Sequence, residues 1–296
     1  MEFPPKDFES LREYLMKLRQ GEIQLEVGKK SLTAMIYMVN NPDKVAVNNI
    51  VELAEITNIS PASITRLAKL LGYKGFNQFQ NIFKQRSMVK SDYYSQKVTK
   101  LMESSNLPPK EIFRQQMQSA YNNMQNCLDN LSDESIVDAT MLLARKKRVF
   151  VFGHKQSSGI ANILRYGLSL IRKEVHFLAQ GEHGIAVALG QLRRDDLVVI
   201  ISSSPYSNLT VDITAMAKKQ DCQILAITDS LLSPLNDHAS LSINVPTEGQ
   251  YFTNSLSANC IFIESLLSLT AMELGQSAVN KLLSHESLLS KFNVNS

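Results

Sequence analysis

The second half of the chain alternates short apolar runs with longer segments of helical periodicity, and this rhythm limits the fold more than any other feature. The runs lack polar alternation, as expected of strands that are buried on both faces of a sheet. Because a helical segment separates most runs, consecutive strands are expected to be parallel. The five runs are residues 149–152, 175–178, 197–201, 223–228 and 241–245. We predict an α/β doubly wound, five-stranded parallel sheet.

Residues 1–88 are predicted to be helical throughout, with breaks at Gly21, Gly28, Asn41-Pro42 and residues 72–75. Residues 89–110 lose the apolar periodicity and contain the stretches Ser-Asp-Tyr-Tyr-Ser and Ser-Ser-Asn-Leu-Pro-Pro, which predicts a linker. The α/β part, residues 111–296, opens with helices near Glu111 and Ser132 and closes with a long apolar helix at residues 254–274. We therefore predict an all-α domain, a linker and an α/β domain.

Composition excludes several classes of protein. The chain of 296 residues, 44% of them hydrophobic, is large enough for two cores. No run approaches the roughly 20 apolar residues that a membrane span needs, and the first residues lack the order of a signal peptide. The cysteines, Cys127, Cys222 and Cys260, are spaced too widely for a zinc site or a disulfide framework and are expected in the core. We expect a cytoplasmic protein with no membrane partner, metal or cofactor.

Basic charge gathers in one segment of the all-α part. The net charge of +3 says little by itself, but residues 60–90 contain six basic residues and no Asp or Glu. Exposed helical surfaces usually mix charges of both signs, so this one-signed segment favours a polyanionic partner over a merely solvated face. The six residues are Arg66, Lys69, Lys74, Lys84, Arg86 and Lys90.

Residues 48–75 have the pattern of a helix-turn-helix. The second helix has Ser60 as N-cap, Pro61 at its first position and Gly72 just past its end. One apolar stripe on this helix consists of Ile64, Leu67, Ala68 and Leu71. The preceding helix carries a matching stripe at Ile50, Leu53 and Ala54, and Ile59 fills the turn between the helices. A helical hairpin that serves only for packing is the alternative.

The polar side of the second helix supplies the candidate DNA contacts. Recognition helices read base edges in the major groove with their N-terminal residues, while flanking polar and basic residues hold phosphates. For base contacts we predict Ala62, Ser63 and Arg66. For phosphate contacts we predict Ser60, Thr65, Lys69 and Lys74.

A family resemblance follows from these motifs. The stretch VNNIVELAEITNISPASITRLAKLLGYKGFNQF closely resembles the helix-turn-helix of the RpiR family of bacterial regulators, and KSLTAMIYMVNNPDKVA is similar to that family's second helix. RpiR-type regulators join this unit to a sugar isomerase (SIS) domain with a flavodoxin-like sheet. The resemblance implies a transcriptional regulator whose affinity for double-stranded operator DNA changes when a phosphorylated sugar or related anionic metabolite binds. We expect a homodimer or homotetramer on an inverted-repeat operator.

Two hydroxyl-rich loops, after the first and third predicted strands, are the candidate effector site. Ligands of open α/β sheets bind beyond the carboxyl ends of the strands, where helix N-termini favour anions. Serines are also common in ordinary turns and caps, so one such loop alone would be weak evidence. The first loop contributes Gly153, Lys155, Ser157 and Ser158. The second loop contributes Ser202, Ser203, Ser204 and Ser207.

Two residues depart from the family pattern in these loops. The family usually has glycine where this chain has Lys155 and where it has Pro205. Proline removes a backbone N–H, and Lys155 either binds the phosphate or fills its place. A SIS domain that serves only for dimerisation therefore stays open as an alternative, and residues 228–235 and Glu248 are further candidates for the pocket wall.

An aldose-ketose isomerase is the enzymatic alternative. Such chemistry needs a general acid and a general base within reach of the sugar carbons. The candidates are His154, Glu182, His183 and Glu248, but spacing fixes no pair of them together. We predict no catalytic residue.

Overall fold

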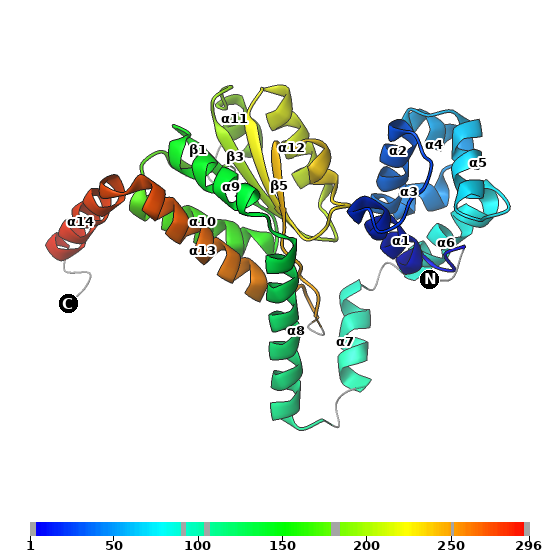
Figure 1. Cartoon of the computed structure of the whole chain (residues 1–296), viewed down its shortest axis with the longest axis horizontal. Coiled ribbons are helices and arrows are strands. Elements are labelled where there is room, and N and C mark those ends of the chain that lie inside the picture. Colours follow the sequence, from blue (N-terminus) through cyan, green and yellow to red (C-terminus); the bar gives the residue numbers. More distant parts are fainter. Residues whose placement is uncertain (1–3, 90–92, 104–106, 179–183, 250–251, 293–296) are drawn as a thin grey trace. The chain divides into compact units, whose positions relative to one another are not determined.

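The computed structural model describes residues 4–89, 93–103, 107–178, 184–249 and 252–292. The chain divides into two compact units, residues 1–104 and 105–296 (Figure 1). The first unit contains α1 (Phe8–Gln20), α2 (Lys29–Asn40), α3 (Pro42–Val47), α4 (Ile50–Thr57), α5 (Pro61–Leu70), α6 (Phe76–Val89) and α7 (Tyr93–Glu103). Helix α7 lies inside the segment 89–110 that we predict to be a linker.

The predicted helix breaks in the first unit fall where the backbone requires them. Gly21 adopts a left-handed conformation, with φ of 78°, and ends α1. Gly28 is the N-cap residue of α2, and Pro42 begins α3. The all-α character of this part of the chain is confirmed.

Aromatic side chains form the centre of the first core. Phe83 of α6 lies edge-on to Phe79, with ring centroids 5.0 Å apart, and to Phe8 of α1 at 5.6 Å. Gln80 is buried on α6, where its side-chain amide donates to the backbone carbonyls of Val45 and Asn48 at the end of α3. The buried hydroxyl of Tyr73 donates to the carbonyl of Pro5 at 2.8 Å. Helix α6 thus packs against both α1 and α3.

The second unit is the predicted α/β domain. Its elements are α8 (Pro109–Asn130), α9 (Asp133–Arg145), β1 (Val149–Gly153), α10 (Ser157–Ile171), β2 (Val175–Phe177), α11 (Gly184–Gly190), β3 (Leu197–Ser202), α12 (Asn208–Lys219), β4 (Gln223–Thr228), η2 (Pro234–Asp237), β5 (Leu241–Asn244), α13 (Ser257–Leu274) and α14 (Gln276–Lys291). The five strands are all parallel in the order β2-β1-β3-β4-β5. The predicted sheet is confirmed, and its strand ends differ from the prediction by no more than one residue.

Each face of the sheet has its own core, because neighbouring residues of a strand point to opposite faces. Val149 and Val151 of β1 pack with α9, α10 and α13 on one face. Figure 1 shows these three helices on the same side of the sheet. Phe150 and Phe152 pack with α11 and α12 on the other face. The two cores explain why the strands read as unbroken apolar runs.

The other predictions about the helices and cysteines of this unit are confirmed in part. Helix α13 corresponds to the predicted closing helix, whereas α14 was not expected. Cys127 and Cys222 are buried as predicted, and Cys260 is half-buried. Among the described residues, no single helix combines the length and hydropathy required to cross a bilayer, although α13 and α14, bent by 108° at their junction, meet that test together.

Candidate functional site

Helices α4 and α5 are locally defined by their caps. The side chain of Asn49 accepts hydrogen bonds from the backbone amides of Val51 and Glu52, and the Glu52 carboxylate accepts from the Asn49 amide at 2.8 Å. Asn58 ends α4 in a left-handed conformation, with φ of 53°. Ser60 caps α5 by accepting from the amide of Ser63. The turn between the two helices is therefore fixed by sequence-local interactions.

Helix α5 buries one side and exposes the other. The predicted stripe is confirmed, since Ile64, Leu67, Ala68 and Leu71 are all buried. Helix α5 packs against α2, α4 and α6 through this side. Of the residues predicted to contact DNA, Ser60, Ala62, Arg66, Lys69 and Lys74 are exposed, and Ser63 and Thr65 are half-buried.

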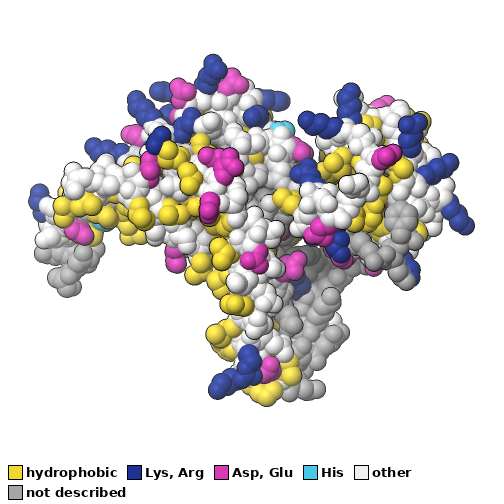
Figure 2. Space-filling view, viewed as in Figure 1, with side chains coloured by type: hydrophobic (Ala, Val, Ile, Leu, Met, Phe, Trp, Pro, Cys, Tyr) yellow, Lys and Arg dark blue, Asp and Glu magenta, His cyan; other side chains and the backbone are white. Residues whose placement is uncertain are grey.

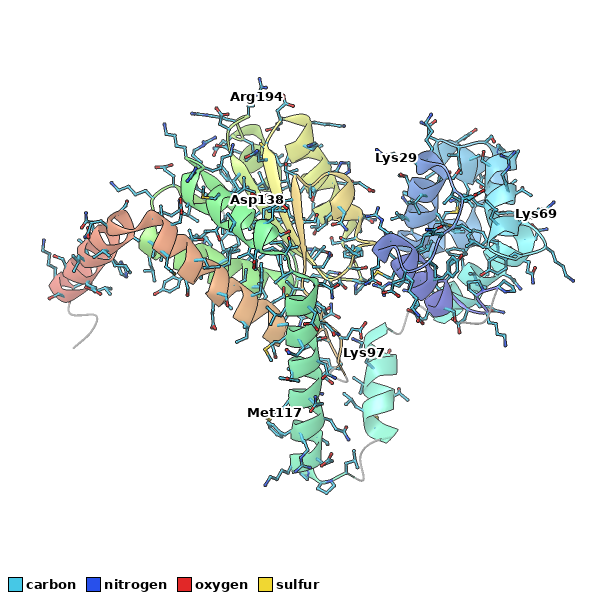
Figure 3. The ribbon with its side chains drawn as sticks, viewed as in Figure 1. Lys29, Lys69, Lys97, Met117, Asp138 and Arg194 are labelled. Carbon is cyan, nitrogen blue, oxygen red and sulfur yellow. The ribbon has the colours of Figure 1, made fainter. Side chains whose placement is uncertain are left out.

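The polar residues on the exposed side of α5 differ in whether their side chains already have a partner within the protein. The hydroxyls of Ser60 and Ser63 lie 2.9 Å apart, and the Thr65 hydroxyl donates to the carbonyl of Pro61. Within the described residues, the side chains of Arg66 and Lys69 form no ion pair, and Figure 3 shows Lys69 projecting away from its helix. These two cations are the strongest candidates for new contacts on this face.

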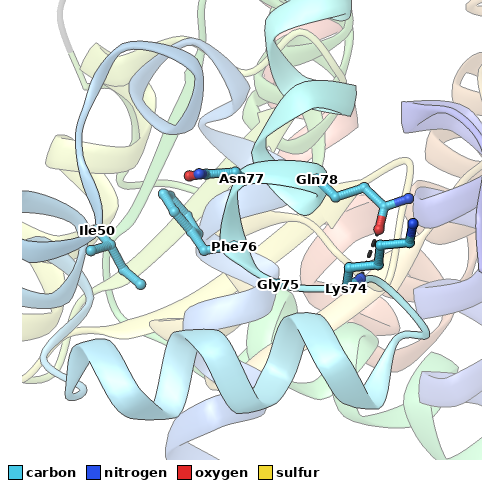
Figure 4. Close-up of a pocket in the computed structure, with 6 residues that line it drawn as sticks. All are labelled: Ile50, Lys74, Gly75, Phe76, Asn77 and Gln78. Atoms are coloured by element: carbon cyan, nitrogen blue, oxygen red, sulfur yellow. Dashed lines mark hydrogen bonds between the residues drawn. The ribbon is translucent and has the colours of Figure 1, made fainter.

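A shallow hollow of about 450 Å³ lies beside α5 and was not anticipated from the sequence. It is lined by Ile50 and by residues 74–78, where α6 begins (Figure 4). The side chain of Gln78 accepts from the backbone amide of Lys74 at 2.7 Å, so the start of α6 is braced beside the basic side chain.

Arg86 does not belong to the free basic surface that the sequence suggests. Its guanidinium donates to the carboxylate of Glu9 at 2.8 Å and lies 4.0 Å from the ring centroid of Phe8. Burial lowers the pKa of Arg86, and the charge of Glu9 acts in the opposite direction. Arg86 therefore fastens α6 to α1, and the basic segment offers less free charge than its composition implies. Lys90 lies outside the described residues.

The two serine-rich loops meet at one point of the sheet. Strands β1 and β3 are neighbours, and from them the chain proceeds toward opposite edges of the sheet. Helices α10 and α12, which follow these strands, pack on opposite faces. This arrangement is the topological switch point at which open α/β sheets form ligand crevices.

Hydrogen bonds tie three segments together at this point. His154 Nδ1 lies 3.2 Å from the hydroxyl of Ser207, which joins the first loop to the second. The Gln156 side chain donates to the Thr253 hydroxyl and to the Asn254 carbonyl, and the Asn254 side chain donates to the carbonyl of Ser204 at 2.7 Å. Sequence reasoning missed residues 253–254, because no local pattern reveals a contact with loops about 50 and 100 residues earlier in the chain.

The first loop is tight and basic. A Cβ atom at Gly153 would collide with the backbone carbonyl of Ser157, so glycine is required there. Lys155 adopts a φ of 53°, the left-handed region that favours the glycine usual at this position. Its side chain is exposed and, like the Ser157 hydroxyl, has no partner within the described part of the chain, whereas the Ser158 hydroxyl donates to the Lys155 carbonyl.

The second loop is held by the carboxylate of Asp229, which lies in the segment 228–235 that is a candidate for the pocket wall. Asp229, directly after β4, accepts from the Ser204 amide at 3.1 Å and from the Tyr206 hydroxyl at 2.6 Å. Ser202 is buried at the end of β3, and Ser203 is half-buried. The sequence placed Asp229 after a strand end, but it did not reveal that its carboxylate accepts from Ser204 and Tyr206 of the second loop.

The candidate acid-base residues do not form a described pair. His154 contacts Ser207, and Glu248 is exposed, with its backbone carbonyl accepting from the buried Asn123 side chain. Glu182 and His183 lie outside the described residues. Among the residues that the structure describes, no three His, Cys, Asp or Glu side chains are grouped as metal ligands would be.

Comparisons with known proteins match both units. A model of the helix-turn-helix domain of the rpiR family matches residues 13–88, and a SIS domain model matches residues 142–269. An uncharacterized HTH-type transcriptional regulator from Haemophilus influenzae is 24% identical over 205 residues, which cover 68% of this chain and 69% of the relative.

Two solved structures share the fold. The sugar isomerase domain of an RpiR transcription factor from Sphaerobacter thermophilus is 24% identical, with a TM-score of 0.56, and the match covers 60% of this chain and 98% of that domain. The Vibrio vulnificus NanR protein, solved in complex with ManNAc-6P, is 19% identical with a TM-score of 0.56. That match covers 94% of this chain and 98% of NanR.

Proposed function

Because this chain belongs to the RpiR family of helix-turn-helix regulators that carry a SIS domain, we propose that it is a phosphosugar-responsive, DNA-binding regulator acting in the cytoplasm. Residues 1–88 bind operator DNA, residues 89–110 connect the two domains, and residues 111–296 bind the effector. The observation that carries the DNA-binding half is α5, which buries Ile64 and Leu67 while exposing Arg66 and Lys69.

In this proposal α5 enters the major groove. Its N-terminal residues, Ala62, Ser63 and Arg66, contact base edges, and phosphates are held by Ser60, Thr65, Lys69 and Lys74. The full chain is expected to bind duplex DNA with an affinity that falls as salt rises, because each neutralised phosphate releases counterions. Binding that is indifferent to salt, or no binding to any duplex, would contradict this half of the proposal.

The effector half rests on the switch point between β1 and β3. The loops there present Lys155 and the Ser157 hydroxyl without partners among the described residues. The related NanR structure holds ManNAc-6P, which supports a phosphorylated sugar as the ligand class for this chain. Gly153, Ser158, Ser202, Ser203, Ser204 and Ser207 complete the proposed effector loops.

A thermal-shift panel of pentose and hexose phosphates tests the effector half. A ligand at 100 times its dissociation constant stabilises the folded protein by about 2.7 kcal/mol. At least one sugar phosphate is expected to raise the melting temperature when its unphosphorylated sugar does not. A flat response across the panel would favour a SIS domain that serves only for dimerisation.

We further propose a homodimer or homotetramer without isomerase activity. Large apolar side chains are exposed on several helices of the second unit, including Phe113, Met117 and Tyr121 of α8 and Met272 of α13. Figure 2 shows hydrophobic side chains along these helices, and such faces are typical of subunit contacts. A two-fold assembly would present two α5 helices to an inverted repeat. Footprinting that protects a single unpaired half-site would contradict this arrangement.

A further inference from the structure

The connection between β5 and α13, of which the structure describes all but residues 250–251, contacts both effector loops. From the first loop, the Gln156 side chain donates to the Thr253 hydroxyl at 3.1 Å and to the Asn254 carbonyl at 2.8 Å. Toward the second loop, the Asn254 side chain donates to the Ser204 carbonyl at 2.7 Å. A displacement of either loop therefore acts on the same short stretch of this connection.

The other side of the connection is held by α8. The side-chain amide of Asn123 on α8 donates to the backbone carbonyl of Glu248 at 2.6 Å. Within the connection, the Ser255 amide donates to the carbonyl of the buried Thr247 at 3.0 Å. Glu248 and Asn254 are the chain neighbours of this closing pair. The contacts with the effector loops and the contact with α8 thus lie on one cross-linked segment.

Helix α8 is well placed to receive a signal from this segment. Asn123 is buried, and burying an amide lowers stability unless it is hydrogen-bonded, so this side chain ties α8 to one particular acceptor. Helix α8 also packs against α13, which follows the connection directly. It is the first helix after the segment 89–110 that we propose to connect the domains. A change in how α8 is held is therefore a change that the DNA-binding unit can respond to.

We propose that this chain of hydrogen bonds transmits effector binding from the two loops to α8. A phosphorylated sugar at the loops shifts Gln156 or Ser204, the cross-linked connection moves with them, and the bond from Glu248 to Asn123 passes the shift to α8. Asn123 is a positioning residue, because it holds the helix and not the ligand. This inference rests on the proposed function and names the regulation of the same site.

The coupling factor, which is the ratio of operator affinities with and without effector, tests this link in the full chain. The probes are glucose 6-phosphate, ribose 5-phosphate and ManNAc-6P, and calorimetry measures their binding separately. Wild-type protein is expected to show a factor of about 5–150 with at least one probe. Asn123→Ala should still bind that probe but reduce the factor to less than about twofold. Asn126→Ala removes the same amide from an exposed position on α8 and should keep the wild-type factor.

Two further variants separate a broken link from a general loss of stability. Asn123→Leu keeps the size of the side chain without its donor, so it should behave as Asn123→Ala if the smaller residue prevents folding. Gln156→Ala combined with Asn254→Ala detaches the effector loops from the connection and should also lower the factor. Adding Asn123→Ala to this pair should lower it no further, because all three changes act on one route.

The outcomes distinguish the link from the function on which it rests. A folded Asn123 variant that keeps the wild-type coupling factor, or a triple variant that loses more than the pair, overturns the link while phosphosugar sensing stands. If no probe changes the operator affinity of the wild-type protein, the proposed function itself fails, and the link fails with it.

Discussion

Arg66 and Arg86 belong to the same basic segment, but their surroundings give them different roles. Arg66 is exposed on α5, and replacing it with alanine should weaken specific DNA binding by about 1–3 kcal/mol and relax the preference at one base pair. The change is measured by titrating the operator and single-base variants of it. An unchanged footprint and unchanged base preference would remove Arg66 from the interface.

Arg86→Ala provides the matched control for Arg66→Ala. This variant loses the pair with Glu9 and the stacking on Phe8, so it should lower the free energy of unfolding by about 1 kcal/mol. Urea denaturation measures that loss. DNA affinity should stay close to wild type when the protein is folded, because Arg86 faces α1 rather than the exposed side of α5.

Buried thiols give a pH dependence with a definite sign. Burial raises the pKa of Cys127 and of Cys222 from an ordinary value of 9.0 to about 11. Unfolded thiols ionise first as the pH rises, so the stability contributed by both groups is present below pH 9 and is lost between about pH 9 and 11. Serine at both positions should flatten this part of the stability profile. An unchanged profile would contradict the assigned burial.

At the scale of single residues, local chemistry was predictable and distant partners were not. Caps and stripes such as Ser60 and Ile64 follow from spacing, since helical periodicity decides which side chains face the core. Arg86 pairs with Glu9, and Ser204 bonds to Asp229, across segments that are distant in the sequence. Helical or strand periodicity does not predict such contacts. Composition therefore overstated the free charge of the basic segment, and the sequence did not reveal that Asp229 bonds to the second loop.

At the scale of elements, the start of α4 is the sharpest test of the helix-turn-helix. Asn49→Ala removes the side chain that accepts from the amides of Val51 and Glu52, and it should cost about 1 kcal/mol of stability. Glu55→Ala, an exposed change in the same helix, should cost much less. Chemical denaturation of the full chain compares the two variants. Equal losses would mean that the cap does not anchor α4.

The strands were more predictable than the outlying helices. Runs such as residues 197–201 are apolar because both faces of the sheet are covered, and that burial is visible in the sequence. Helices α7 and α14 left no comparable signal. Helix α14 has one buried residue, Ala278, among many exposed ones. Its sequence therefore lacks the apolar stripe that marks a helix packed on a core.

At the scale of the whole molecule, the proposal requires the two units to communicate. Effector binding should change operator affinity by a coupling free energy of about 1–3 kcal/mol, and DNA should change effector affinity by the same factor. Replacing Ser157 and Ser204 together with alanine should abolish this response and leave the basal affinity for the operator intact. DNA titrations with and without the sugar phosphate measure both quantities. A double variant that still responds would place the ligand elsewhere.

The hydrogen bond from Tyr73 to Pro5 sets a limit on how far the amino end can be trimmed. Pro5 is buried, and its carbonyl is the acceptor for a hydroxyl that burial keeps away from water. Deleting residues 1–3 leaves this acceptor in place. Deleting residues 1–5 removes it, so the buried Tyr73 hydroxyl loses its hydrogen bond and the free energy of unfolding falls by about 1–3 kcal/mol. Shortened versions made for crystallography or for fusion to reporters should therefore begin no later than Pro5.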